Sequence, residues 1–421
     1  MKKMVSLVLA LLMLLGTATT LAEVTLTYND WSSVDTAWSD CYADLLARFD
    51  ELYGDEITVE TYGTTAAETR QAMLLSASAG TNEDCAKTKP EWLEELVNMG
   101  VLADLNELLP QEVLDDYADG VLEDFTFDGK LYAISFFNQA YAIYYNKDLL
   151  EKAGVTELPT TYPELIEAAY KVAALGQDEN GNKIYGIGYS NGANKAGDSN
   201  VWLTLLWGYG GEFQDEEGNI TLYSEENLEA FNVIKNLLVD DVSPAGLSWQ
   251  DLRQIFAAGN MGFFPELLSQ TTLFTSVSEL GEDFLDHIGV MEFPEGTGYN
   301  TQSLLVIFEN SENKEAAAKF IEFLSSEEGL KILYEHNKGK TSDRLSVVES
   351  VYSDEAELDE FTQVFVDAAA HNRSLPMLAD PAFAPADLAI TDAIHRMYAG
   401  EDVETVLKEL DAEVKGYYGQ N

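Results

Sequence analysis

The sequence predicts an α/β fold built from more than one compact unit. Runs of β-branched and aromatic residues alternate along the chain with amphipathic helical patterns, which is typical of sheets covered by helices. At 421 residues the chain is too long for one small core. Hydrophobic residues make up 46% of it, so each unit has enough apolar side chains to bury a core.

The composition is strongly acidic and excludes several classes of partner. The chain has 74 Asp and Glu residues against 24 Lys and Arg residues, a formal net charge of −50. Nucleic-acid binding needs a basic patch that neutralises phosphates, and docking on anionic lipid needs basic segments. We therefore expect neither partner. An acidic surface suits a soluble protein that avoids unspecific contacts.

The N-terminus predicts export. Lys2 and Lys3 precede an apolar run from Val5 to Leu15, and Ala22 supplies the small residue of a cleavage site. The run is shorter than a bilayer-spanning helix. We expect residues 1–22 to be a signal peptide. Because the cleavage site has no cysteine for an acyl anchor, the mature chain is expected in the periplasm or outside the cell.

The first third of the chain alternates strands and helices. Strands are predicted at Val24–Tyr28 and Ile57–Tyr62, and helices at Thr36–Tyr53, Ala66–Ser78 and Glu91–Met99. The two strands alternate and are rich in β-branched residues. Tyr42, Leu45 and Phe49 lie on one stripe of the first helix, and Gly100 is the expected C-cap of the third.

The middle of the chain is predicted to hold two short strands, Lys130–Ile134 and Ala142–Tyr145, with Phe136–Gln139 interrupting the pair. A helix follows at Tyr162–Ala174, because Thr161 is a good N-cap and Pro163 fits a first turn. The Asp-Glu-Asn-Gly-Asn sequence in Gln177–Ile187 predicts a hairpin turn. Its glycine is not at the sixth position that a calcium loop needs, so a metal site is not expected there.

The remainder of the chain is mainly helical by pattern. Helices are predicted at Asn227–Val239, Asp251–Ala258, Ser311–Leu324, Ser325–Tyr334, Asp387–Ala399 and Val403–Tyr417. Gly400 separates the last two, where a glycine commonly ends a helix.

Catalytic and metal motifs are missing from the sequence. None of the four histidines forms a His-x-x-His or His-Glu-x-x-His pair. There is no P-loop or dinucleotide glycine fingerprint. Carboxylate pairs carry little information in so acidic a chain. We therefore predict no catalytic residues, no metal and no cofactor.

Polar and aromatic residues gather instead where predicted strands end. Trp31 follows the first strand, Tyr62 and Thr64 follow the second, and Glu266 follows an apolar run. Ligands of open α/β sheets bind beyond the carboxyl ends of the strands. An aromatic ring there offers a flat face to a sugar ring, and a neighbouring carboxylate or amide binds its hydroxyls. A ligand contact is favoured for Trp31, whereas a core position is favoured for Trp207.

Several segments, in this order, carry a resemblance to a known family: Lys130–Asn138, Tyr144–Leu150, Ala153–Val155, Leu158–Leu165, Phe256–Phe263, Phe293-Pro294, Asn313–Ser325 and Tyr398–Gly400. Over essentially its whole mature length the chain resembles the family 1 extracellular solute-binding proteins. These are the maltose-binding-protein-like receptors of ABC importers.

The resemblance implies a two-lobed class II periplasmic-binding-protein-like fold with a hinge of crossing strands. Lobe 1 would comprise residues 23–137 plus 296–340, and lobe 2 residues 138–295 plus 341–421. It also implies a monomer that binds a carbohydrate, an oligosaccharide, in the cleft between the lobes. The closed form would then deliver this ligand to the transmembrane subunits of an ABC permease, without chemistry.

The resemblance also suggests ligand contacts, carried over position by position. They are Trp31, Asp35, Tyr62, Thr64, Glu91, Asn138, Trp202, Glu266 and Arg344.

The third strand of lobe 1 departs from the family pattern. It should be apolar, but here it contains Lys87 and Lys89. Charged residues in a central parallel strand are costly. Either the strand is short and exposed, or a lysine points into the cleft and binds an anionic group on the ligand, such as a uronic acid.

The sequence leaves the state of the cysteines and the class of ligand open. Cys41 and Cys85 could be free thiols or a disulfide. The same aromatic and acidic residues would suit a polyamine or another cation. An exported glycoside hydrolase and a binding protein coupled to a chemoreceptor are further possibilities.

Overall fold

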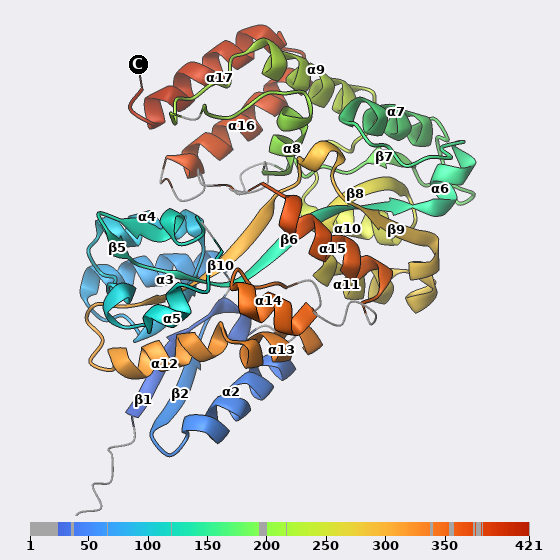
Figure 1. The fold of residues 1–421 in the computed structure, drawn as a ribbon. Coiled ribbons are helices and arrows are strands. Elements are labelled where there is room, and N and C mark those ends of the chain that lie inside the picture. Colours follow the sequence, from blue (N-terminus) through green and yellow to red (C-terminus); the bar gives the residue numbers. More distant parts are fainter. Residues whose placement is uncertain are drawn as a thin grey trace, which may run out of the picture.

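The computed structural model describes residues 24–34, 38–64, 66–118, 120–192, 200–215, 217–336, 340–352, 358–373, 375, 380 and 382–420. The predicted signal peptide and Asp35 lie outside these residues. The chain forms two groups of strands and helices that are joined by two long strands, β6 and β10 (Figure 1). The predicted α/β class, with two lobes and crossing strands, is confirmed.

The sheet of the first lobe has the strand order β2-β1-β3-β10-β6. Its members are β1 (Val24–Asn29), β2 (Ile57–Tyr62), β3 (Cys85–Thr88), β10 (Asn300–Ile307) and the first half of β6 (Ile134–Asn146). Strands β2 and β3 are parallel to β1, whereas β10 is antiparallel to both β3 and β6. The first lobe is thus completed by a strand from late in the chain.

The sheet of the second lobe continues from the other half of β6. That half is antiparallel to β8 (Met261–Leu267) and to β9 (Ile288–Met291), and β7 (Tyr185–Ile187) runs parallel to β8. One strand therefore belongs to both sheets and crosses between the lobes.

The prediction of two short strands around residues 136–139 was wrong. Strand β6 is continuous over 13 residues, and Phe136 and Phe137 are buried within it. Gln302 pairs with Asn138, at the point where the backbone of Asn138 also exchanges hydrogen bonds of 2.7 and 2.9 Å with Thr341. These polar residues mark the crossing between the lobes and do not break the strand.

Helices cover the first sheet and enclose one hydrophobic core. They are η1 (Trp31–Val34), α2 (Ser39–Tyr53), α3 (Ala66–Ala79), α4 (Pro90–Asn98), η2 (Leu105–Glu107), α5 (Gln111–Leu114), η3 (Glu123–Phe125), α12 (Lys314–Leu324), α13 (Glu327–His336) and α14 (Leu345–Tyr352). A small hairpin, β4 (Thr126–Phe127) and β5 (Lys130–Leu131), joins them. This core includes Leu26, Phe49, Phe137, Leu305 and Val347.

The second lobe holds two further cores beneath its own helices. These are α6 (Lys147–Lys152), α7 (Tyr162–Ala173), α8 (Asn200–Gly208), α9 (Glu225–Val239), α10 (Trp249–Ala257), η4 (Leu268–Gln270), α11 (Thr271–Val277), η5 (Gly281–His287), η6 (Pro294–Gly296), α15 (Glu360–His371), α16 (Phe383–Tyr398) and α17 (Val403–Tyr417). The predicted cap of α7 is confirmed, because Thr161 and Glu164 form a capping box.

Two acidic turns resemble each other and are closed by their own side chains. The carboxylate of Asp178 accepts hydrogen bonds from the backbone N–H groups of Asn180 and Asn182, and that of Asp215 accepts from Glu217 and Asn219. These are Asx-type turns, in which the side chain replaces a backbone acceptor. The predicted turn at Asp178 is confirmed.

Both cysteines are free, buried thiols in the first lobe. Burial raises the pKa of Cys41 to about 11 and raises the pKa of Cys85 well above its ordinary value. The possibility of a disulfide was therefore wrong. Within the residues described above, no helix is long and apolar enough to cross a membrane.

Candidate ligand-binding site

The carboxyl ends of both sheets point toward the crossing between the lobes. Strand β10 starts at the crossing, where Asn300 pairs with Ala140, and its first-lobe partner β3 runs in the opposite direction. Strands β1, β2 and β3 therefore end on the side of the second lobe. In that lobe β8 ends with Leu267 beside Tyr141, next to the crossing. The loops that leave both sheets thus face each other, as ligand sites of open α/β sheets do.

In the first lobe, a buried carboxylate organises the turn after β1. Asp30 accepts hydrogen bonds from the hydroxyl of Tyr28 at 3.0 Å and from the backbone N–H of Ser32 at 2.8 Å. It also forms an ion pair with Lys87 of β3, whose ammonium donates to the Ser32 hydroxyl at 2.5 Å. Asp30 and Lys87 are 0% and 1% exposed.

Trp31 lies in this turn among other side chains that the sequence singled out. The Lys87 Nζ is 4.0 Å from the centroid of the Trp31 ring, a distance typical of a cation–π contact. Trp92 of α4 packs against Trp31 edge to face, with centroids 5.3 Å apart. The Lys89 Nζ lies 6.0 and 5.9 Å from the two rings. Glu91 is in the first turn of α4, which follows β3, so this residue lies at the same edge of the sheet as Trp31.

A second buried lysine lies beside the first. The Nζ of Lys340 is 3.9 Å from the centroid of Trp38 and 5.2 Å from that of Phe137. Burial, together with the nearby Lys87, lowers the pKa of Lys340 to about 7. The side chains of Lys87 and Lys340 and these aromatic rings form the buried base of the candidate site in the first lobe, which is called the first wall below.

The end of β2 packs tightly on the end of β1. At Gly63 a Cβ atom would lie 2.2 Å from the carbonyl oxygen of Asp30, so only glycine fits this close approach. Tyr62 is 47% exposed and its hydroxyl contacts Glu60 at 2.8 Å. The hydroxyl of Thr64 is 3.2 Å from that of Thr69. Both predicted residues therefore leave the sheet near Trp31, with Tyr62 open to solvent.

The burial of β3 excludes one of the two alternatives that its lysines had left open. The strand is short, with four residues, but all four are buried, so the alternative of an exposed strand was wrong. Lys87 is buried under the turn that carries Trp31, and Lys89 follows the strand and is half-buried at the start of α4.

The second lobe contributes a wall with a different charge pair. The Nε of Arg253, in α10, donates to the Glu266 carboxylate at 2.7 Å. Glu266 is fully buried, while the side chain of Arg253 is 20% exposed. The predicted contact Glu266 thus lies behind Arg253, a residue that no pattern in the sequence had indicated.

Aromatic rings flank this pair at the crossing. Tyr141 stacks on Tyr299 with centroids 4.5 Å apart, and Trp249 lies 6.1 Å from Tyr141. Asn372 holds the backbone of both tyrosines through hydrogen bonds of 3.1 Å to their carbonyl oxygens. The next residue, Arg373, lies with its guanidinium carbon 4.4 Å from the centroid of Trp207.

Trp202 and Trp207 both pack in the core of the second lobe. Trp202 is 2% exposed, its indole N–H donates to the carbonyl of Ser190 at 2.9 Å, and its ring contacts Tyr189. The structure therefore places the predicted contact Trp202 in the core, because its polar atom already has a partner. Trp207 is buried, as its core prediction expected.

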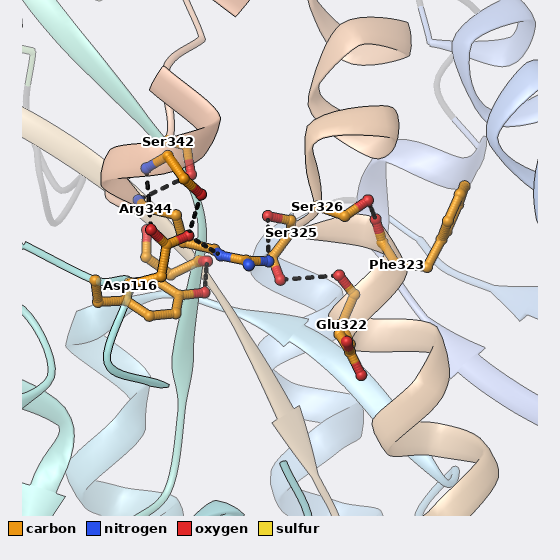
Figure 2. Close-up of polar contacts among 10 residues, drawn as sticks. Asp116, Glu322, Phe323, Ser325, Ser326, Ser342 and Arg344 are labelled. Carbon is orange, nitrogen blue, oxygen red and sulfur yellow. Dashed lines mark hydrogen bonds and ion pairs between the residues drawn. The ribbon is translucent and has the colours of Figure 1, made fainter. Parts of the chain in front are cut away.

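Asn138 and Arg344 lie at the hinge itself. The side-chain amides of Asn138 and Gln302, from the two long strands, both donate to the carboxylate of Asp343 at 3.1 Å. Arg344 forms an ion pair with Asp116 at 3.0 Å and donates to the carbonyl of Ser325 (Figure 2). Arg344 thus binds two residues of the first lobe and holds the segment after the crossing against that lobe.

The two walls can hold a ligand by stacking and hydrogen bonding. The arrangement brings together Trp31, Tyr62, Thr64 and Glu91 on one wall and sets Arg253 with its aromatic neighbours on the other. Among the residues that the structure describes, no three potential metal ligands of the His, Cys, Asp or Glu type come together.

Comparisons with known proteins identify the family of this chain. Residues 39–331 match the model of the family described as bacterial extracellular solute-binding proteins. A binding protein of Brucella abortus is 28% identical over 361 residues, which are 82% of this chain and 81% of that protein.

Two solved structures show the same fold. One is an ABC transporter solute-binding protein from Thermotoga lettingae bound with α-D-tagatose, which is 20% identical with a TM-score of 0.77 over 94% of this chain and 99% of that one. The other is a maltose-bound protein of T. maritima, 23% identical with a TM-score of 0.76 over 94% and 100% of the two chains. The chain belongs to the bacterial extracellular solute-binding protein family.

Proposed function

We propose that this protein is the extracytoplasmic receptor of an ABC importer and that it binds a carbohydrate, an oligosaccharide, reversibly between its lobes. The observation that carries the proposal is the pair of facing walls, each with aromatic rings beside a charged group. Sugar rings bind through such faces, while charged groups and amides bind their hydroxyls. Structural relatives bound to tagatose and to maltose support this class of ligand.

The proposed contacts combine the predicted residues with their places in the fold. On the first wall they are Trp31, Tyr62, Thr64 and Glu91. Asp35 lies outside the described residues and stays a prediction from the family resemblance. On the second wall Glu266 acts through Arg253, with Trp249 beside it. Asn138 contributes at the crossing. We leave Trp202 and Arg344 out of the set, because their polar groups are already engaged inside the protein.

We propose lobe boundaries close to residues 23–137 plus 296–340 and 138–295 plus 341–421. The composition of the cores supports the division at β6 and β10. Val347 of α14 packs in the first core, which supports extending the first lobe through Tyr352. A ligand that touches both lobes would favour their closed arrangement, which the transmembrane subunits of the permease would recognise.

Export to the periplasm or the cell exterior belongs to the same proposal. It rests on the Lys2–Ala22 signal pattern and on the family description. Mass spectrometry of the secreted protein is expected to find Glu23 as its first residue.

A cation receptor fits the first wall poorly. The ring face of Trp31 already meets the ammonium of Lys87 at 4.0 Å, and Lys89 lies close by. A polyamine at this ring would be repelled by Lys89, whereas the charge of Lys87 is offset by the carboxylate of Asp30. Lys89 therefore favours a saccharide that carries a carboxylate over one that carries an amine.

A thermal-shift panel tests the proposal. Neutral mono- and oligosaccharides, uronic acids, polyamines and amino acids are added to the purified protein. A ligand at 100 times its Kd stabilises the folded state by about 2.7 kcal/mol. We expect a rise in Tm with one class of saccharide. A shift with polyamines alone would contradict the carbohydrate assignment, and release of nitrophenol from aryl glycosides would contradict binding without chemistry.

A further inference from the structure

Lys87 occupies a position where a sheet normally carries an apolar side chain. Strand β3 lies between β1 and β10 and all its residues are buried. An ammonium ion in such a place costs free energy unless its environment compensates for lost water. Burial lowers the pKa of Lys87, and the neighbouring Asp30 carboxylate opposes this effect. Completing the sheet does not require a charge at this position, so the charge indicates another role.

The contacts of Lys87 converge on one short segment. Its ammonium meets the carboxylate of Asp30, the ring of Trp31 and the hydroxyl of Ser32, three consecutive residues after β1. The ring of Trp38 lies further away, with its centroid at 5.6 Å. Lys87 therefore ties the turn after β1 to the next strand of the sheet.

This tie restricts the ring of Trp31. The indole contacts both the ammonium of Lys87 and the ring of Trp92, and the backbone of the turn is held by the Asp30 carboxylate. Side chains that are ordered before a ligand arrives lose less entropy on binding, which raises affinity. The turn that carries Trp31 is thus ordered by contacts within the protein, before any ligand binds.

We propose that Lys87 is a positioning residue that raises ligand affinity by holding Trp31 in its binding orientation. This inference rests on the proposed function, because it takes Trp31 to be a ligand contact. Lys87 itself is 1% exposed and reaches the ligand only through the turn.

A double-mutant cycle tests the proposal by isothermal titration with the saccharide that binds in the thermal-shift panel. Lys87→Met is made alone and together with Trp31→Ala. We expect Lys87→Met to weaken binding about tenfold when Trp31 is present, the size of one aromatic contact. Without Trp31 the loss should fall to about twofold or less, the limit of additivity. An equal loss in both backgrounds would overturn the proposal.

A second readout needs no ligand. The contribution of Trp31 to acrylamide quenching is the difference between the protein and its Trp31→Phe variant. We expect Lys87→Met to increase this contribution, because the freed ring becomes more accessible. If Trp31 is quenched equally with and without Lys87, the inference fails even where saccharides bind. If no saccharide binds but quenching rises, the proposed function fails and with it the effect on affinity, although Lys87 still holds the ring of Trp31.

Two further variants serve as a milder test and as a control. Ser32→Ala removes only the hydroxyl partner of Lys87, and we expect a smaller change in the same direction should Lys87→Met not fold. Lys408→Met is the matched control, because Lys408 also joins a carboxylate, Glu404, and a ring, Tyr223, on the exposed face of α17. It should leave both readouts unchanged.

Discussion

Each of the two walls of the candidate site contains a buried ion pair, but the two pairs differ in exposure. Each buries one carboxylate at the end of a strand, Asp30 after β1 and Glu266 in β8, and pairs it with a cation from another element. In the first lobe the cation, Lys87, is 1% exposed. In the second lobe the cation, Arg253, is 20% exposed.

The difference in exposure indicates a difference in role. The ammonium of Lys87 contacts Asp30, Ser32 and the Trp31 ring, all within the same wall. A guanidinium has five N–H donors in a planar fork, and only the Nε of Arg253 donates to Glu266 in the described part of the chain. The first pair therefore stabilises the wall from inside, whereas the second can also present donors to a ligand.

Breaking each pair should give the largest effect. Asp30→Ala leaves a fully buried ammonium without its carboxylate, which costs about 3–5 kcal/mol of unfolding free energy. Glu266→Ala leaves Arg253 able to reach water, so we expect only about 1–3 kcal/mol. Urea denaturation of both variants measures the contrast. Equal losses would mean that exposure does not separate the two pairs.

Replacing the exposed cation should affect binding. Arg253→Lys keeps the positive charge but removes the planar fork. Charged hydrogen bonds contribute about 1.5–3 kcal/mol, so ligand affinity should fall roughly tenfold or more. Isothermal titration measures the affinity and urea denaturation the stability. A loss of stability with unchanged affinity would place Arg253 in the same internal role as Lys87.

Raising the pH should change the first wall alone, because arginine stays charged. The pKa of Lys340 is lowered to about 7, against about 10.4 in an unfolded chain. Between these values the unfolded state binds a proton that the folded state does not, so unfolding free energy rises with pH. The difference between the protein and Lys340→Met should grow by up to about 1.4 kcal/mol per pH unit in this range. A difference that stays flat in urea titrations from pH 7 to 10 would contradict this.

The smallest expected effect concerns Lys89. This half-buried lysine lies near the rings of Trp31 and Trp92. Lys89→Ala should weaken binding of acidic oligosaccharides by about 0.2–1 kcal/mol, as for partly exposed charges, and more so at low salt. Neutral oligosaccharides serve as the control. Equal weakening of both classes would remove the argument for an anionic ligand.

Regular local patterns made much of the fold predictable. The helix predicted at Val403–Tyr417 has those bounds in the structure, and β2 begins and ends as predicted. Helix α14 was missed, because its valines favour a strand and its packing on α13 is not visible in the sequence. Strand β6 was divided because Asn138 and Gln139 suggest a loop when their partners at the crossing are unknown.

The candidate site was predictable only where it follows strands. The rule that ligands bind after strands selected Trp31, Tyr62 and Thr64, whereas Glu91 came only from the family resemblance. Arg253 lies in a helix and Tyr299 precedes a strand, so the rule could not find them. Trp202 was selected as an aromatic residue, but its hydrogen bond to a backbone carbonyl depends on tertiary contacts that the sequence does not show.

The pairing of β3 with β10 also constrains the order of folding. Cys85 pairs with Ile307, so one side of β3 has no strand partner until almost three quarters of the chain is available. Such contacts between distant residues slow folding, because a long loop must close before they form. The chain therefore emerges from synthesis with an incomplete first lobe. If the chain is exported as proposed, this delay would favour translocation, because the first lobe cannot complete its sheet before the late strand is available.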